Sequence, residues 1–151
     1  MRKVRRIAVI GGSRIPFCRS NSMYASKTNL DMLAAALQGL SDRFGLDGVQ
    51  LDEVIAGAVT SHPKDFNLAR EALLSTTLSP LTPGITMQQA CGTSLQAALM
   101  IGAKIATGQI ECGIAAGTDT TSDPPISFGR KFSQRLVKAG AARSAGQRLR
   151  A

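Results

Sequence analysis

Aromatic residues are scarce in this chain of 151 residues, which has no tryptophan, one tyrosine and five phenylalanines. That scarcity disfavours a nucleic-acid surface built from stacked aromatic side chains. Histidine is represented once, by His62, and the three cysteines are Cys18, Cys91 and Cys112. Their spacing fits no metal site, and an odd number disfavours a disulfide framework. We therefore expect no metal and a reducing compartment.

Long hydrophobic runs are also missing. The basic residues near the N-terminus precede only a short apolar run at residues 7–10, which ends at Gly11 and Gly12. This run is too short for the core of a signal peptide or for a membrane span. We expect a soluble, cytoplasmic protein without a transmembrane segment.

The sequence does contain apolar runs that alternate with helical patterns, and 44% of its residues are hydrophobic. A chain of this length can form one domain with a substantial core. The apolar runs predict buried strands at residues 7–10, 54–59, 85–90 and 113–116. Apolar periodicity predicts helices at about residues 30–44, 67–74 and 93–107. The order β-α-β-α-β-α-β favours an α/β fold with a mostly parallel sheet and helices on its faces.

Several residues indicate where the predicted helices begin and end. Thr28 and Asp31 have the spacing of a capping box, while Gly45 and Gly108 are placed to end helices. The helix at residues 93–107 is apolar on nearly every side. Such a helix is expected to be buried on all sides within a larger protein.

One cysteine stands where the third predicted strand passes into the third predicted helix. Cys91 is followed by Gly92, which allows the backbone to turn sharply. Backbone N–H groups at a helix N-terminus favour a thiolate, so this position suits a nucleophile. Taken alone, the cysteine would more often be a small buried hydrophobe. Cys18 and Cys112 are expected to be packing residues.

The segment around Cys91 reads Gln-Gln-Ala-Cys-Gly-Thr-Ser-Leu-Gln-Ala over residues 88–97 and resembles the active-site motif of thiolases. Three other segments are similar to thiolases in order and spacing: residues 6–17, with Ile15 in place of the usual threonine, residues 67–70 and residues 108–119. The resemblance covers about residues 5–138. It implies an incomplete thiolase-like half-domain over residues 1–126, without its last strand, and the basic start of a loop region over residues 127–151.

The resemblance implies an acyl-CoA C-acyltransferase in which Cys91 is the catalytic nucleophile. Its sulfur would attack the carbonyl of an acyl-CoA or 3-ketoacyl-CoA and hold the acyl group as a thioester. CoA, or the carbanion of acetyl-CoA, would then accept that group, in fatty-acid β-oxidation or acetoacetyl-CoA formation. Coenzyme A thioesters would be substrates, with no permanently bound cofactor. Homo-oligomers through the strand at residues 85–90 and a partner in a β-oxidation complex are also implied.

The sequence departs from the family in what it does not contain. Thiolases take an activating histidine from a Gly-His-Pro motif, a second cysteine from a Cys-Gly-Gly-Gly motif and an oxyanion-hole asparagine from their C-terminal half; none is present here. His62 precedes Cys91 and is expected to be a loop histidine. Asp119 and Asp123 fall in a Thr/Ser-rich turn, which explains them more simply than a carboxylate pair.

We therefore expect an N-terminal fragment that is inactive alone and leaves one face of the helix at residues 93–107 bare. Large exposed apolar patches imply a partner or aggregation, so we expect poor solubility or oligomers. The alternative hypothesis is a non-catalytic fragment that serves only as an association module.

Positive charge is concentrated at the C-terminal end. Residues 1–129 contain eleven Lys/Arg and ten Asp/Glu, whereas residues 130–151 contain seven Lys/Arg and no acid. This basic stretch is interpreted first as a solvated helix and second as a region that attracts the phosphates of CoA. Non-specific binding to nucleic-acid phosphates is the third interpretation, and no specific nucleic-acid partner is expected.

Overall fold

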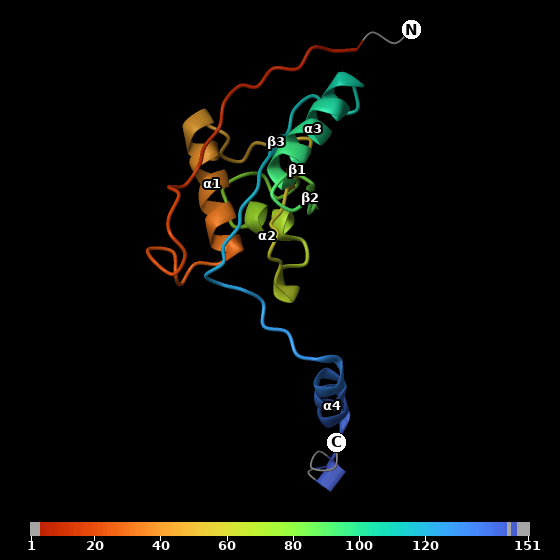
Figure 1. Ribbon diagram of the computed structural model, residues 1–151. Helices are drawn as coiled ribbons and strands as arrows, with labels where there is room; N and C mark the ends of the chain where they lie inside the picture. The colour runs from red at the N-terminus through yellow and green to blue at the C-terminus, as the bar shows by residue number, and fades with distance from the viewer. Residues whose placement is uncertain (1–3, 145, 148–151) are drawn as a thin grey trace.

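The computed structural model describes residues 4–144 and 146–147 of the chain (Figure 1). Its elements are, in order, α1 (Asn29–Phe44), β1 (Val54–Ala56), the 3-10 helix η1 (Pro63–Asp65), α2 (Leu68–Leu74), β2 (Gly84–Thr86), α3 (Thr93–Ala106), β3 (Ile114–Ala115) and α4 (Arg130–Ala141).

The three strands form one parallel sheet in the order β2-β1-β3. Val54 of the central strand stands beside Gly84 of β2 and beside Ile114 of β3. The predicted α/β fold with a parallel sheet and helices on its faces is therefore confirmed. The strands are shorter than predicted, although single backbone hydrogen bonds continue beyond them, from Met87 N to Ala56 O and from Thr118 N to Gly57 O, each at 3.0 Å.

Side chains of β1 alternate between two cores, as the pleat of a strand requires. Val54 and Ala56 pack with buried residues of α1 and α2, whereas Ile55 packs with Ala97 and Ile101 of α3. Helices α1 and α2 thus cover one face of the sheet and α3 covers the other, as the arrangement in Figure 1 shows.

The predicted start and stop signals of the helices are confirmed. Thr28 Oγ1 accepts a hydrogen bond from Asp31 N at 3.1 Å, and Asp31 Oδ2 accepts one from Thr28 N at 3.0 Å. These bonds form the capping box of α1, and the backbone bond from Thr28 lowers the pKa of the Asp31 carboxyl. Gly45 and Gly108 follow α1 and α3 with φ of 64° and 74°, the left-handed conformation that glycine adopts without strain.

The prediction of a buried strand at residues 7–10 is wrong. The segment forms no strand, and the exposed fractions of Ile7, Val9 and Ile10 are 50%, 92% and 85%. An apolar run becomes a strand only where a neighbouring strand supplies hydrogen-bond partners. A cavity separates this segment from β3, so the neighbour that it needs is not beside it.

Helix α3 is buried on one side only. Ala97 and Ile101 pack under it, whereas Leu95 and Leu99 are 68% and 59% exposed. The helix is thus not buried on all sides within this chain, and the expected bare apolar face is confirmed.

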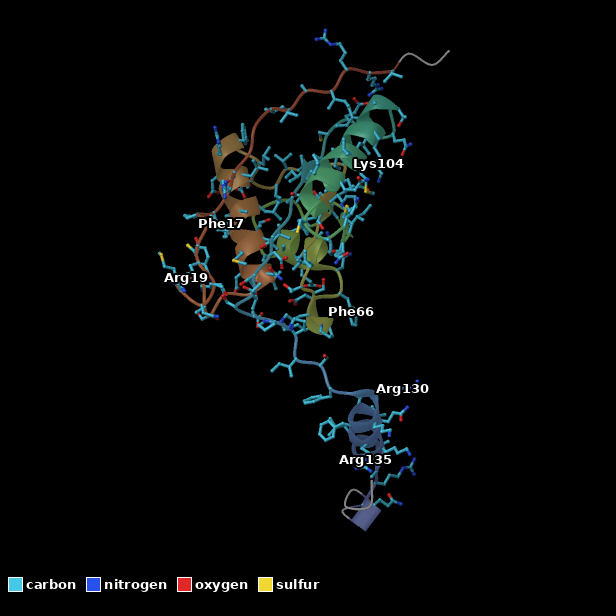
Figure 2. All side chains as sticks on the ribbon, viewed as in Figure 1. Phe17, Arg19, Phe66, Lys104, Arg130 and Arg135 are labelled. Carbon is cyan, nitrogen blue, oxygen red and sulfur yellow. The ribbon has the colours of Figure 1, made fainter. Side chains whose placement is uncertain are left out.

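Helix α4 stands away from the rest of the chain in Figure 1 and has no buried residue. In Figure 2 its side chains Arg130 and Arg135 point away from the helix axis. Phe128 and Phe132 pack edge to face, with ring centroids 5.1 Å apart. The first interpretation of the basic stretch, a solvated helix, is confirmed for residues 130–141. Within the described residues, no helix combines the length and the apolar character needed to cross a membrane.

Candidate functional site

The corner between β2 and α3 places Cys91 on the surface. Strand β2 ends at Thr86 and α3 begins at Thr93, so residues 87–92 form the corner. Ala90 has φ of 46°, a left-handed conformation that costs a non-glycine residue roughly 1–2 kcal/mol. The Cys91 side chain is exposed. Strained backbone residues cluster at functional sites, where the surrounding structure holds them in place.

The hydroxyl of Thr93 holds the backbone of this corner. Thr93 Oγ1 accepts a hydrogen bond from Gln89 N at 2.9 Å and donates one to Ala90 O at 2.8 Å. Gly92 N adds a third bond to Gln89 O at 3.0 Å. Because Thr93 is 5% exposed, these bonds are shielded from water. The strained conformation of Ala90, and hence the position of Cys91, is fixed from inside the protein.

A glycine beneath the corner allows β1 to approach it closely. A Cβ atom on Gly57 would lie 1.7 Å from Met87 O and 3.1 Å from Thr93 Cγ2. Met87 N also donates to Ala56 O at 3.0 Å, so the corner continues the pairing of β2 with β1. Only a residue without a side chain fits at position 57. Sequence reasoning missed this role, although a glycine inside a strand pattern is itself a sign of close backbone approach.

An ion pair fixes the other end of α3. Lys104 Nζ lies 2.7 Å from Glu53 Oε1 and 2.6 Å from Oε2, and Glu53 is only 8% exposed. Lys104 is labelled on α3 in Figure 2, and it belongs to the last turn of this helix, whereas the corner precedes the first turn. The pair joins the last turns of α3 to the residue before β1. Sequence reasoning missed this pair, because 51 residues separate its members.

The N-terminus of α3 faces the corner without a side-chain cap. Its N-cap residue is Gly92, which has no side chain to accept from the first N–H groups of the 14-residue helix. The partial positive charge of a helix N-terminus therefore lies next to Cys91. An oxyanion at this corner, such as the oxygen of a reacting carbonyl, is favoured by that charge.

The other residues discussed from the sequence form local bonds. His62 Nε2 lies 3.0 Å from Asp123 O and 3.2 Å from Asp123 Oδ2, as expected of a loop histidine. Asp119 Oδ1 accepts from Thr60 Oγ1 at 2.7 Å. The two aspartates thus have separate partners and form no carboxylate pair. Among the described residues no hydrogen bond or ion pair joins His62 to Cys91.

The remaining cysteines differ in exposure. Cys18 is half-buried, whereas Cys112 is exposed, so the prediction that Cys112 is a packing residue is wrong. The backbone of this residue, rather than its side chain, holds the segment in place. Cys112 N donates a hydrogen bond to Asp52 Oδ2 at 3.1 Å, and Glu111 N donates one to the same oxygen at 2.7 Å. Those two donors lower the pKa of the Asp52 carboxyl. The chain therefore carries two exposed thiols, only one of which precedes a helix.

Comparison with known proteins identifies a family and several similar proteins. Residues 7–146 match the family profile described as "Thiolase, N-terminal domain". The chain is 36% identical over 147 residues to a 3-ketoacyl-CoA thiolase of Shewanella baltica strain OS155, covering 97% of this chain and 34% of that protein. It is 35% identical over 144 residues to a 3-ketoacyl-CoA thiolase of Shewanella sediminis, covering 95% of this chain and 33% of that protein.

Among solved structures, the acetyl-CoA acetyltransferase of Bacillus anthracis is similar in fold. The TM-score is 0.69 and the sequence identity 25%, over 74% of this chain and 28% of that one. The chain thus spans about a third of the length of the curated relatives it matches.

Proposed function

This chain belongs to the thiolase family, whose N-terminal domain it contains, and we propose that it is the part of an acyl-CoA C-acyltransferase that carries the acyl group on Cys91. The observation that supports this role best is the corner between β2 and α3. There an exposed thiol directly follows a strained residue and directly precedes an uncapped helix N-terminus. A structural cysteine needs none of these features.

The proposed chemistry has two halves. In the first half, the Cys91 thiol gives its proton to solvent and its Sγ attacks the carbonyl carbon of an acyl-CoA thioester. A new S–C bond forms, the bond to CoA sulfur breaks, and the CoA thiolate that leaves takes up a proton from solvent. The acyl group is now a thioester on Cys91. In the second half, CoA or the carbanion of acetyl-CoA attacks that thioester and releases Cys91. The N-terminus of α3 favours the negative charge that develops at the corner in both halves.

The first half can proceed slowly with the thiol and its corner alone, whereas fast acylation and complete turnover also need a base and a second thiol. The family takes those two groups from Gly-His-Pro and Cys-Gly-Gly-Gly motifs, which are not among these 151 residues. We therefore propose that this chain alone accepts an acyl group slowly and does not turn over. The complete reaction would run in the cytoplasm, either as a step of β-oxidation or as acetoacetyl-CoA formation. Which of the two directions it takes is determined by the whole enzyme.

Association of two copies through residues 85–90 is part of the proposal. Strand β2 lies at the edge of the sheet, where it pairs only with β1 among the described residues. An edge strand offers unpaired N–H and C=O groups to another chain. Pairing of this kind would bring the Cys91 corners of two copies near one interface.

The test is the intact mass of the chain after incubation with acetyl-CoA at neutral pH. The wild type is expected to gain one acetyl group, Cys91→Ser none, and Cys112→Ser one. Cys112 is the matched control because its thiol is also exposed but precedes no helix. An unmodified wild type, or an acetyl group that persists in Cys91→Ser, contradicts the proposal.

The second candidate function is that of a non-catalytic association module. It is supported by the open edge of β2 and by the exposed face of α3, where Leu95 and Leu99 contact solvent. The mass measurement separates the two candidates, because a module that only associates forms oligomers and takes up no acetyl group.

A further inference from the structure

Helix α4 contributes nothing to the two cores of the chain. None of its residues is buried, and in Figure 1 it stands away from the other elements, after a stretch at residues 124–129 that forms no regular element. A helix of 12 residues without tertiary contacts is only marginally stable in water. Its stability would increase on a surface that received one of its faces. No feature of the proposed acyl transfer uses this helix.

One side of α4 is an apolar stripe. Phe132, Leu136 and Ala139 follow one another at spacings of four and three residues, which places them on the same side of a helix. Phe128 extends the stripe before the helix begins, because its ring packs edge to face with that of Phe132. The exposed fractions of Phe128, Phe132 and Leu136 are 57%, 48% and 47%. The stripe therefore meets solvent over about half of its large side chains.

Basic side chains flank this apolar stripe. Lys131, Arg135 and Lys138 repeat the spacings of four and three, one residue earlier, so they lie about 100° around the helix from the stripe. In residues 4–144 and 146–147, no ion pair involves these three side chains. The last acidic residue of the sequence is Asp123, and residues 124–151 contain no other carboxylate side chain. The helix thus combines a bare apolar stripe with unpaired positive charge.

The positive charges do not stabilise the helix itself. Arg130 and Lys131 stand in its first turn, where the partial positive charge of a helix N-terminus disfavours cations, and this turn contains no acid. The N-cap residue, Gly129, makes no side-chain hydrogen bond to the first N–H groups. Both features weaken a helix that is surrounded by water alone. A surface rich in phosphate groups reverses both, because it supplies acceptors for the free N–H groups and counter-ions for the two cations.

We propose that α4, together with Phe128, lies on the surface of an anionic lipid membrane, with the apolar stripe among the upper acyl chains and the basic side chains at the head groups. A helix with one apolar face, one cationic face and low overall hydrophobicity is the form that binds at a membrane interface. Long lysine and arginine side chains extend along the apolar boundary and bring their charges to the head groups. With 12 residues, or about 18 Å, α4 is too short to cross a bilayer, so the contact is with its surface.

Two other partners match α4 less well. Phosphates of CoA or of a nucleic acid would pair with the basic side chains, but they offer no apolar surface to Phe132 and Leu136. A second copy of the chain could offer the exposed apolar face of α3, at Leu95 and Leu99, but α3 contains no acidic residue that could pair with the flanking cations. An anionic membrane surface matches the stripe and the charges together. Both alternatives are outcomes of the test.

The test is flotation of the 151-residue chain with lipid vesicles, either of phosphatidylcholine alone or with about a third of the lipid replaced by phosphatidylglycerol. The partition coefficient onto the anionic vesicles is expected to be at least about tenfold higher than onto the neutral ones. It is expected to fall as salt is added, because salt screens the attraction. The helical signal in circular dichroism is expected to rise with the anionic vesicles, because the interface stabilises α4.

Two double variants examine the two faces of α4 separately. Phe132→Ala with Leu136→Ala removes the stripe and keeps every charge, and alanine preserves the helix; binding is expected to weaken at least about tenfold. Lys131→Gln with Arg135→Gln keeps the stripe, and binding is expected to weaken about 25-fold, because each cation near an anionic surface contributes roughly a factor of five. Because none of these residues is buried, the two cores stay intact. The matched control, Phe66→Ala, removes an exposed phenylalanine outside α4 and is expected to bind like the wild type.

Several results would overturn the inference. Equal partitioning onto neutral and anionic vesicles, no partitioning onto either, or weaker binding in the Phe66 control would show that α4 and its charges are not what binds. Undiminished binding after loss of the apolar stripe would assign the helix to phosphates alone. Loss of oligomers, without any change in vesicle binding, in the same variant would assign the stripe to a second copy. The readout involves no acyl transfer, so its failure is distinct from a failure of the function proposed for Cys91.

Discussion

Replacing Thr93 by valine is expected to loosen the corner that carries Cys91. Valine has nearly the shape of threonine but removes the hydroxyl, and with it the 2.9 Å bond from Gln89 N and the 2.8 Å bond to Ala90 O. Each lost hydrogen bond costs about 1 kcal/mol, and a donor left unpaired next to a buried residue costs more. We expect two effects. The free energy of unfolding falls by about 2–3 kcal/mol, and the backbone at Ala90 leaves its strained conformation more often, which changes the reactivity of Cys91.

Equilibrium unfolding in urea measures the first effect. With a slope of about 2 kcal/mol per M, the midpoint is expected to fall by about 1 M. The matched control is Thr93→Ser, which keeps the hydroxyl and removes the methyl group that lies near Gly57. Loss of one methyl group costs about 1 kcal/mol, so serine is expected to destabilise less than valine. The alkylation rate of Cys91, relative to that of Cys112 in the same molecule, measures the second effect.

Which of the two variants is less stable in urea shows whether hydrogen bonding or packing holds the corner. If serine destabilises the chain more than valine, the methyl group rather than the hydroxyl holds the corner, and the argument from Thr93 Oγ1 is refuted. An unchanged alkylation ratio in Thr93→Val would show that the position of Cys91 does not depend on these bonds.

Three further predictions follow from other parts of the structure. Gly57→Ala is expected to cost at least about 1–3 kcal/mol in urea unfolding, because its Cβ would lie 1.7 Å from a carbonyl oxygen, whereas Gly12→Ala, which meets no atom within 4 Å, is expected to stay within about 0.5 kcal/mol of the wild type. The folded-state pKa of Asp31 is lowered, so its ionised form stabilises the chain at pH values above the ordinary pKa of 3.8. In acid unfolding curves, the extra stability of the wild type over Asp31→Asn is expected to disappear as the pH falls through the lowered pKa. A constant difference in stability down to the most acid pH would contradict this prediction. Leu95→Lys combined with Leu99→Lys is expected to reduce the oligomer mass in light scattering, because it removes the exposed apolar face of α3, and an unchanged mass would place the self-association elsewhere.

Local sequence signals predicted much of the fold because they act over a few residues. The capping box of Thr28 and Asp31 and the glycines after α1 and α3 are where the sequence places them. Apolar runs also located the three strands that pair, and the residue order around Cys91 located the corner. Each of these features depends on side chains and backbone groups within one turn or one strand.

The features that sequence reasoning missed depend on contacts between distant segments. The run at residues 7–10 is as apolar as a buried strand. It forms no strand, because a cavity lies between it and β3. Gly57 is required because Met87 O passes over it, and Glu53 is buried because Lys104 reaches it. A single sequence carries no periodicity that reports such contacts.

The central claim is that the fold, rather than cysteine chemistry in general, makes Cys91 an acyl acceptor. Its most direct test is peptide mapping of acetyl groups after incubation with acetyl-CoA, once for the native chain and once in urea. The account predicts that native Cys91 is acetylated at least about tenfold faster than Cys112, which is also exposed, and that the two rates become similar when the chain is unfolded. Equal rates in the native chain, or a preference for Cys91 that survives unfolding, would contradict the claim.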